Sequence, residues 1–218
     1  MALTARSQFP AYTVAAKSSA SMTARWQLLS DPYAAGFSIA VVLYVVAEAA
    51  IYVWMPTYLA SYTGRYEMVA AYALATFFVL RAGGRFLGAW VLAKIPWKTT
   101  LTIFSGLVAA CYAGAVTLGV DYAIWLLPLS GLFMSIIYPT LNSKGISSFS
   151  AEQHGAIAGI LLFFTAAAAA LGPLIMALLG DAFGDVAYGF LFTMGCACAL
   201  FMLCLANQYF NFTRERLG

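Results

Sequence analysis

Three ionisable residues, Glu48, Arg81 and Arg85, lie deep inside long apolar stretches of the sequence. One charged side chain near the centre of a bilayer costs about 2.5–3.5 kcal/mol on insertion scales, so three unpaired charges would cost roughly 8–10 kcal/mol. We therefore expect these side chains to face the protein interior or water, and to pair. Such an ion pair either supports the architecture or belongs to a binding site.

Depth in the apolar stretches favours one of the two arginines as the partner of Glu48. Glu48 lies about 21 Å along the helix from residue 34, the start of its stretch. Arg81 lies roughly 18 Å, and Arg85 about 12 Å, from residue 93, the end of theirs on the same side of the membrane. We predict a Glu48–Arg81 pair, with Arg85 reaching toward water or toward carbonyl groups at the helix end.

Aromatic residues surround Glu48 at helical spacing. Tyr44, Glu48 and Tyr52 are four residues apart and share one face of a helix, with Trp54 close by. Aromatic rings stack on the apolar faces of a pyranose, and a carboxylate binds its hydroxyl groups. The pattern predicts a binding site for a sugar-like solute, although an aromatic stripe in a membrane helix is also common in plain packing.

A second polar stripe occurs three apolar stretches later. Ser135, Tyr138 and Asn142 stand at positions i, i+3 and i+7 of an otherwise apolar helix, and we predict that they also contact substrate. Pro139 lacks the N–H of a regular helix and should interrupt it. The dipeptide at 139–140 repeats the Pro-Thr of 56–57, which fits a three-plus-three inverted repeat with broken helices around a central site.

Composition and periodicity predict an all-α membrane protein. Hydrophobic residues make up 63% of the 218 residues and charged residues 9%, against about 25% charged in a soluble domain. Six stretches of about 20 apolar residues are candidate membrane spans: 34–62, 69–93, 101–120, 122–141, 156–179 and 186–205. We expect 34–205 to form a six-helix bundle, with 206–218 as a cytoplasmic tail.

The first 33 residues are expected to be a cytoplasmic tail or the remnant of a central loop. They lack the apolar core of a secretory signal peptide. Their serine-rich, acid-free composition with Arg6, Lys17 and Arg25 leaves an organelle transit peptide as an alternative.

Basic residues are strongly biased to one side of the predicted spans. One set of loops carries only Arg65, together with four acids, whereas the other set carries most of the basic residues: Arg6, Lys17, Arg25, Lys94, Lys98, Lys144, Arg214 and Arg216. The positive-inside rule places both termini in the cytoplasm, in a plasma or inner membrane. These charges form no patch with interleaved aromatic residues, so no nucleic-acid partner is expected.

Metal, cofactor and catalytic motifs are not evident in the sequence. The four cysteines all lie in apolar stretches, namely Cys111, Cys196, Cys198 and Cys204. The single histidine, His154, stands at the end of a span, away from any serine in the setting that a six-helix membrane protease needs. We expect no cofactor, no metal and no enzymatic activity.

Small residues four apart indicate close helix packing. Gly84 and Gly88, and likewise Gly155 and Gly159, would let two helices approach closely in lipid.

Three segments resemble the fucose–proton symporter family of the major facilitator superfamily. They are Tyr-Val-Val-Ala-Glu at 44–48, Gly-Arg-Phe-Leu-Gly-Ala-Trp at 84–90 and Phe-Met-Ser-Ile-Ile-Tyr-Pro-Thr at 133–140. The resemblance implies that the six spans correspond to helices seven to twelve of a twelve-helix fold. It also implies a proton-coupled secondary transporter of sugars that works by alternating access.

Two departures from the family pattern limit what the resemblance implies. Glu48 stands where the family's fucose symporter has a glutamine, and Ile137 where it has a polar amide, so fucose itself is not implied as the substrate. The acidic residues that the family uses for proton coupling lie in the half that has no counterpart here, so coupling is assigned to no residue of this chain.

Because the resemblance covers half of a twelve-helix transporter, we expect a second six-helix unit as partner and keep one alternative function. A separate amino-terminal six-helix half, or a second copy in a parallel homodimer, would complete a central site. The alternative is a truncated or non-transporting six-helix subunit or scaffold.

Overall fold

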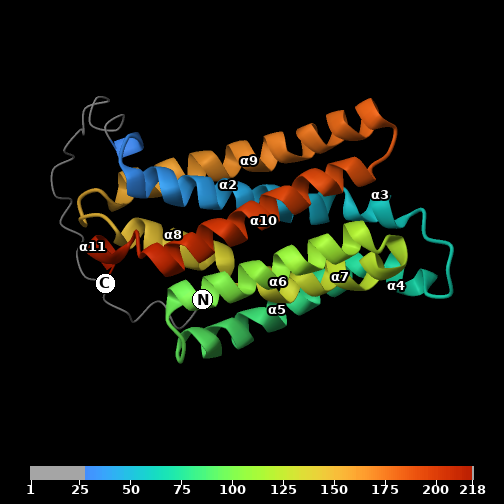
Figure 1. Ribbon diagram of the computed structural model, residues 1–218, viewed down its shortest axis with the longest axis horizontal. Helices are drawn as coiled ribbons and strands as arrows, with labels where there is room; N and C mark the ends of the chain where they lie inside the picture. The colour runs from blue at the N-terminus through green and yellow to red at the C-terminus, as the bar shows by residue number, and fades with distance from the viewer. Residues whose placement is uncertain (1–27, 218) are drawn as a thin grey trace, which may run out of the picture.

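The computed structural model describes residues 28–217, and every regular element in that range is helical. Six spans are long and apolar enough to cross a membrane, as predicted (Figure 1). They are α2 (Pro32–Val53), α5 (Ala73–Leu92), α6 (Trp97–Thr117), α7 (Val120–Met134) with α8 (Ile137–Ser147), α9 (His154–Phe183) and α10 (Ala187–Phe210). Short helices are α3 (Met55–Leu59), α4 (Glu67–Ala71) and α11 (Arg214–Leu217). The predicted tail and its charges at positions 6, 17 and 25 lie outside the described residues.

Two of the spans are interrupted where proline predicts it. α2 ends at Val53, and α3 begins two residues later with Pro56 in its first turn. The span formed by α7 and α8 breaks at Ser135 and Ile136, just before Pro139. Each proline lacks the N–H that would bind the carbonyl four residues earlier. These breaks therefore release backbone acceptors at corresponding places in the two halves of the bundle.

The helices pack as two interlocked groups. α2 packs against α9 and α10, whereas α5 packs on α7. α6 packs against both α10 and α7 and so joins the groups (Figure 1). Fully buried aromatic side chains fill the centre, namely Tyr44, Phe77, Tyr112 and Phe190.

Glycines bring α5 close to the break between α7 and α8. A Cβ at Gly84 would collide with the Leu132 carbonyl and the side chain of Ser135, and one at Gly88 would collide with Ile136. The predicted close packing at this pair is confirmed. The same prediction for Gly155 and Gly159 is wrong within this chain, because both lie on the exposed side of α9 with nothing within 4 Å of an added Cβ.

α8 continues to Ser147, beyond the predicted end of its span at 141, and two later helices also extend beyond their predicted ends. α9 continues to Phe183 and α10 to Phe210, so residues 206–210 of the predicted tail are helical. Each helix ends at a residue with left-handed backbone, Gly184 (φ 75°) or Asn211 (φ 56°). The predicted ends followed the apolar stretches, but the left-handed residue decides where the helix terminates.

An ion pair joins the two ends of the described chain. The Arg216 guanidinium in α11 donates to both carboxylate oxygens of Asp31, at 3.1 and 2.7 Å. Asp31 also caps α2 by accepting from the N–H of Tyr33 at 2.8 Å. Arg216 lies over the rings of Tyr33 and Phe149, so α11 is held against the start of α2 and the α8–α9 connection.

Candidate functional site

An ion pair between α2 and α5 lies at the centre of the candidate site. Arg81 Nη1 contacts Glu48 Oε1, and Arg81 also donates to the hydroxyl of Tyr52. The side chains of Arg81 and Glu48 remain 16% and 13% exposed. The pair is therefore mostly buried, with a small accessible part on each side chain.

Tyr44 connects this pair to the interrupted span. Its side chain is fully buried, and its hydroxyl lies 2.7 Å from Glu48 Oε1 and 3.0 Å from the carbonyl of Met134, the last residue of α7. The single hydroxyl hydrogen is shared between these two acceptors. The ring of Tyr44 also stacks on Tyr138 of α8, with centroids 6.0 Å apart. A movement of the backbone at the α7–α8 break would therefore change the hydrogen bond between Tyr44 and Glu48.

Aromatic rings enclose the guanidinium of Arg81. Its Cζ lies 5.9 Å from the ring centroids of both Tyr52 and Phe77. Tyr52 in turn stacks on Phe78 at 5.5 Å and meets Phe77 edge-on at 5.9 Å. A cation over aromatic faces gains about 0.5–2 kcal/mol according to its desolvation. Arg81 is thus held by a carboxylate, a phenol and two rings.

The other predicted site residues lie apart from this group. The Trp54 indole donates to the carbonyl of Pro173 in α9 at 3.2 Å. Ser135 is buried and donates to the Leu132 carbonyl at 2.8 Å. No hydrogen bond or ion pair within residues 28–217 connects Asn142 or the exposed Arg85 to Glu48.

The predicted stripe of Ser135, Tyr138 and Asn142 does not form, because the helix breaks at its first residue. Ser135 lies in the break and Tyr138 lies after it, so positions i, i+3 and i+7 do not share one regular helix face. Tyr138 alone reaches the Glu48 group, through its ring contact with Tyr44. Its hydroxyl bonds to Thr165 of α9 at 3.1 Å.

Two polar residues that hold the group were not anticipated from the sequence. Tyr112 of α6 is fully buried, and its hydroxyl donates to the Ala47 carbonyl in α2 at 2.5 Å. Thr165 of α9 binds the hydroxyl of Tyr138. A lone polar residue inside an apolar span was the only signal for either of them.

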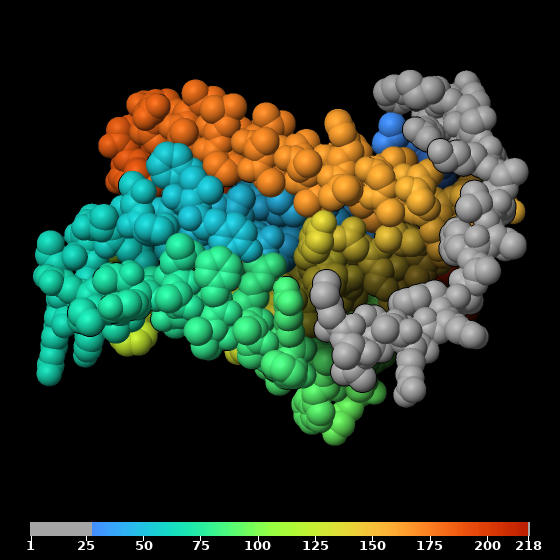
Figure 2. All heavy atoms as spheres, turned by 180° about the vertical axis from the view of Figure 1, so that it is seen from behind, coloured from blue at the N-terminus to red at the C-terminus, as the bar shows by residue number. Residues whose placement is uncertain are grey.

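The group belongs to a face that other helices frame. Figure 2 shows α2 and α3 lying between α9 on one side and α5 on the other, with α8 beside them. Large apolar side chains on both framing helices are exposed, such as Phe78 and Phe86 on α5 and Leu162 and Phe163 on α9. Within residues 28–217, no three metal-binding side chains come together.

The family model of the Major Facilitator Superfamily matches residues 5–173. The chain belongs to this superfamily. Two solved structures are similar: a variant of the E. coli fucose:proton symporter FucP, and the MFS transporter FucP in the outward conformation. Each gives a TM-score of 0.79 at 22% sequence identity and covers 94% of this chain and 50% of that chain. A comparison with curated protein sequences finds no significant match.

The predicted fold is therefore confirmed as a six-helix half of the major facilitator fold. The chain spans about half the length of the structures it matches. The superfamily and the six apolar spans make this chain a multi-pass membrane protein of the major facilitator superfamily.

Proposed function

We propose that this chain is the carboxy-terminal half of a secondary active transporter for sugars or similar small polar solutes, coupled to protons. A second six-helix half, or a second copy of this chain, completes the site. The observation that carries the proposal is the Glu48–Arg81 pair, set among Tyr44, Tyr52 and Tyr138 where the broken helices meet.

The chemistry of this group suits a polyhydroxylated solute. Glu48 accepts hydrogen bonds from hydroxyl groups, and Arg81 and the tyrosine hydroxyls donate to them. The ring of Tyr52 is 36% exposed and offers an aromatic surface beside the carboxylate. A site at the midplane of a transporter lies between two halves, so one half supplies only part of its walls.

The family resemblance assigns coupling to no residue of this chain, and we propose from the geometry of the ion pair that the charge of Glu48 contributes to it. A proton on Glu48 removes the charge that attracts Arg81 and leaves the guanidinium free to bind solute. When the proton departs to the other side, the pair forms again and the solute is released. Because Tyr44 bonds to both Glu48 and the Met134 carbonyl, the exchange reaches the break between α7 and α8.

The test is substrate-driven proton movement by the reassembled transporter. Glu48→Gln keeps size and hydrogen bonding but loses the charge, so we expect uptake or its pH dependence to fall at least about tenfold while folded protein persists. Glu67→Gln, at an exposed acid in α4, is the matched control and should behave as wild type. Wild-type uptake with an unchanged pH profile in Glu48→Gln would reduce the pair to an architectural role.

A non-transporting six-helix subunit is the second candidate function. The coverage of half of the matched structures fits this candidate as well as it fits a transporter half. An adjacent reading frame that encodes a six-span chain would favour the transporter half.

A further inference from the structure

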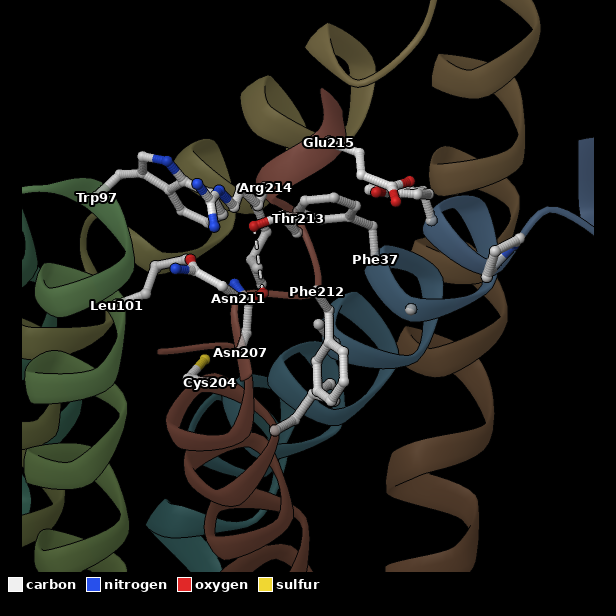
Figure 3. Close-up of a pocket in the computed structure, with 16 residues that line it drawn as sticks. Phe37, Trp97, Leu101, Cys204, Asn207, Asn211, Phe212, Thr213, Arg214 and Glu215 are labelled. Atoms are coloured by element: carbon white, nitrogen blue, oxygen red, sulfur yellow. Dashed lines mark hydrogen bonds between the residues drawn. The ribbon is translucent and has the colours of Figure 1, made fainter. Parts of the chain in front are cut away.

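A cavity of about 640 Å³ lies at the end of the bundle that carries the basic loops, between α2, α6, α10 and α11 (Figure 3). Its inner wall is apolar and includes Phe37, Ala40, Leu101 and Leu203. The volume falls within the range of about 300–1,000 Å³ that small-molecule sites occupy. Ala40 precedes Glu48 by eight residues, or about 12 Å along α2, so the cavity is separate from the candidate transport site.

Positive charge gathers at the outer end of this cavity. Lys98 Nζ donates to Asn211 Oδ1, in the cavity lining, at 2.6 Å. Lys98 and Lys144 lie 5.7 and 5.6 Å from the ring centroid of Trp97, which also lines the cavity. In Figure 3 the guanidinium of Arg214 extends toward the same ring.

These three cations have no carboxylate partner among the described residues, whose ion pairs are Glu48–Arg81 and Asp31–Arg216. Glu215 is the single carboxylate of the lining. α6 begins at Trp97 without a side-chain cap, so its positive dipole end adds to the same field. The outer end of the cavity is therefore complementary to an anion.

The mouth of the cavity has an exposed aromatic edge. Phe210 and Phe212 are 73% and 61% exposed and stack at 5.5 Å, and Phe212 lines the cavity. Tyr209 beside them is 79% exposed, and exposed tyrosines at a span end are typical of the membrane–water interface. This aromatic edge favours an opening at the level where headgroups meet acyl chains.

We propose that this cavity binds an anionic phospholipid. The phosphate lies between Lys98 and Arg214, and an acyl chain extends along Phe37 and Leu203. An apolar chain joined to an anion matches both the apolar wall and the cationic rim, and basic pockets between membrane helices bind anionic headgroups in this way.

The first test is native mass spectrometry of the purified chain with phosphatidylglycerol or phosphatidylcholine. We expect phosphatidylglycerol to be retained about tenfold better, and the preference to vanish in Lys98→Gln/Arg214→Gln. Lys94→Gln, at a lysine on the same end that stacks on Trp90 instead, is the matched control and should keep the preference. Equal retention of the two lipids, or a preference unchanged in the double variant, would overturn the proposal.

A second variant tests the acyl chain without changing any charge. Gly36 lines the cavity, and an added Cβ there meets nothing within 4 Å, so Gly36→Leu places its side chain in open space. We expect it to lower phosphatidylglycerol retention, whereas Gly83→Leu, equally open on α5, should not. Full retention in Gly36→Leu, or complete displacement of the lipid by millimolar inorganic phosphate, would contradict a lipid site.

Discussion

At the scale of single residues, the architectural and functional roles of the Glu48–Arg81 pair are separated by removing first one charge and then both. Removing one partner leaves the other charge half-buried in a membrane protein, which costs stability whichever role is right. Removing both charges together spares that cost. Function should then fail only if the charges act on solute or protons.

We predict that Arg81→Gln and Glu48→Gln each lower the stability of the folded chain by about 1–3 kcal/mol, less than the roughly 3–5 kcal/mol of a fully buried pair because both side chains keep some exposure. The double variant should recover most of that loss. Thermal unfolding in detergent measures it. Additive losses in the double variant would show that the two side chains do not act as a pair.

Much of the Glu48 group was predictable because it depends on spacing and depth. The positions of Tyr44 and Tyr52 beside Glu48 follow from their four-residue spacing on an unbroken helix. Arg81 was predicted as the partner because its depth in the membrane matches that of Glu48. Trp54 could not be placed from the sequence, since it donates to a carbonyl of α9 that only the folded chain brings near. Ser135 instead donates to Leu132, only three residues before it, at a break whose exact position the sequence did not give.

At the scale of elements, the contact of α5 with the α7–α8 break sets the position of Arg81. Gly84 lies three residues after Arg81 and packs against Leu132 and Ser135. A side chain at Gly84 would push α5 away from the break and carry Arg81 with it. The glycine thus acts on the site through the helix.

We predict that Gly84→Ala destabilises the chain by about 1–3 kcal/mol, the usual cost of overpacking. Gly83→Ala is the matched control, because its Cβ would meet nothing within 4 Å; it should gain up to about 1 kcal/mol from helix propensity. Thermal unfolding of the two variants side by side measures the difference. Equal melting temperatures would mean that α5 moves freely over α7.

The breaks in the elements were predictable from the sequence and the ends were not. Pro56 and Pro139 each remove a donor, so the sequence marks both places as candidate interruptions. Pro128 and Pro173 lie inside continuous helices, so the missing donor alone does not decide where a helix breaks. The ends of α9 and α10 depend on left-handed backbone at Gly184 and Asn211. Asn211 in particular gives a weak signal, because asparagine adopts many other conformations.

At the scale of the whole molecule, Asp31 and Arg216 join segments 185 residues apart, a contact that no local pattern predicts. Partial burial raises the pKa of the Asp31 carboxyl, but the hydrogen bond from Arg216, the N–H of Tyr33 and the attraction of the guanidinium outweigh it. The pKa of Asp31 is therefore held below its ordinary value of 3.8.

A lowered carboxyl pKa means stability that is fully present above the ordinary value and lost as pH falls through the lowered one. We predict that Arg216→Gln costs up to about 1 kcal/mol at pH 7. The cost should stay constant down to about pH 5 and shrink below the ordinary pKa. Unfolding of both forms across pH measures it, and a cost that grows toward acid would have the wrong sign.

The orientation of the whole bundle follows from its loop charges and needs its own measurement. We predict that reporter fusions after Gly64, Asp121 and Asp181 report the outside. Fusions after Lys98 and Lys144 should report the cytoplasm. The opposite result at any two of these sites would contradict cytoplasmic termini.

The central claim is that this chain is one half of a transporter whose site another six-helix unit completes. Sugar uptake by proteoliposomes tests it most directly, with the purified monomeric chain alone and with an amino-terminal six-helix half. We predict no uptake above empty liposomes for the monomer, and uptake that depends on Glu48 once both halves are present. Sugar uptake by the lone monomer would contradict it.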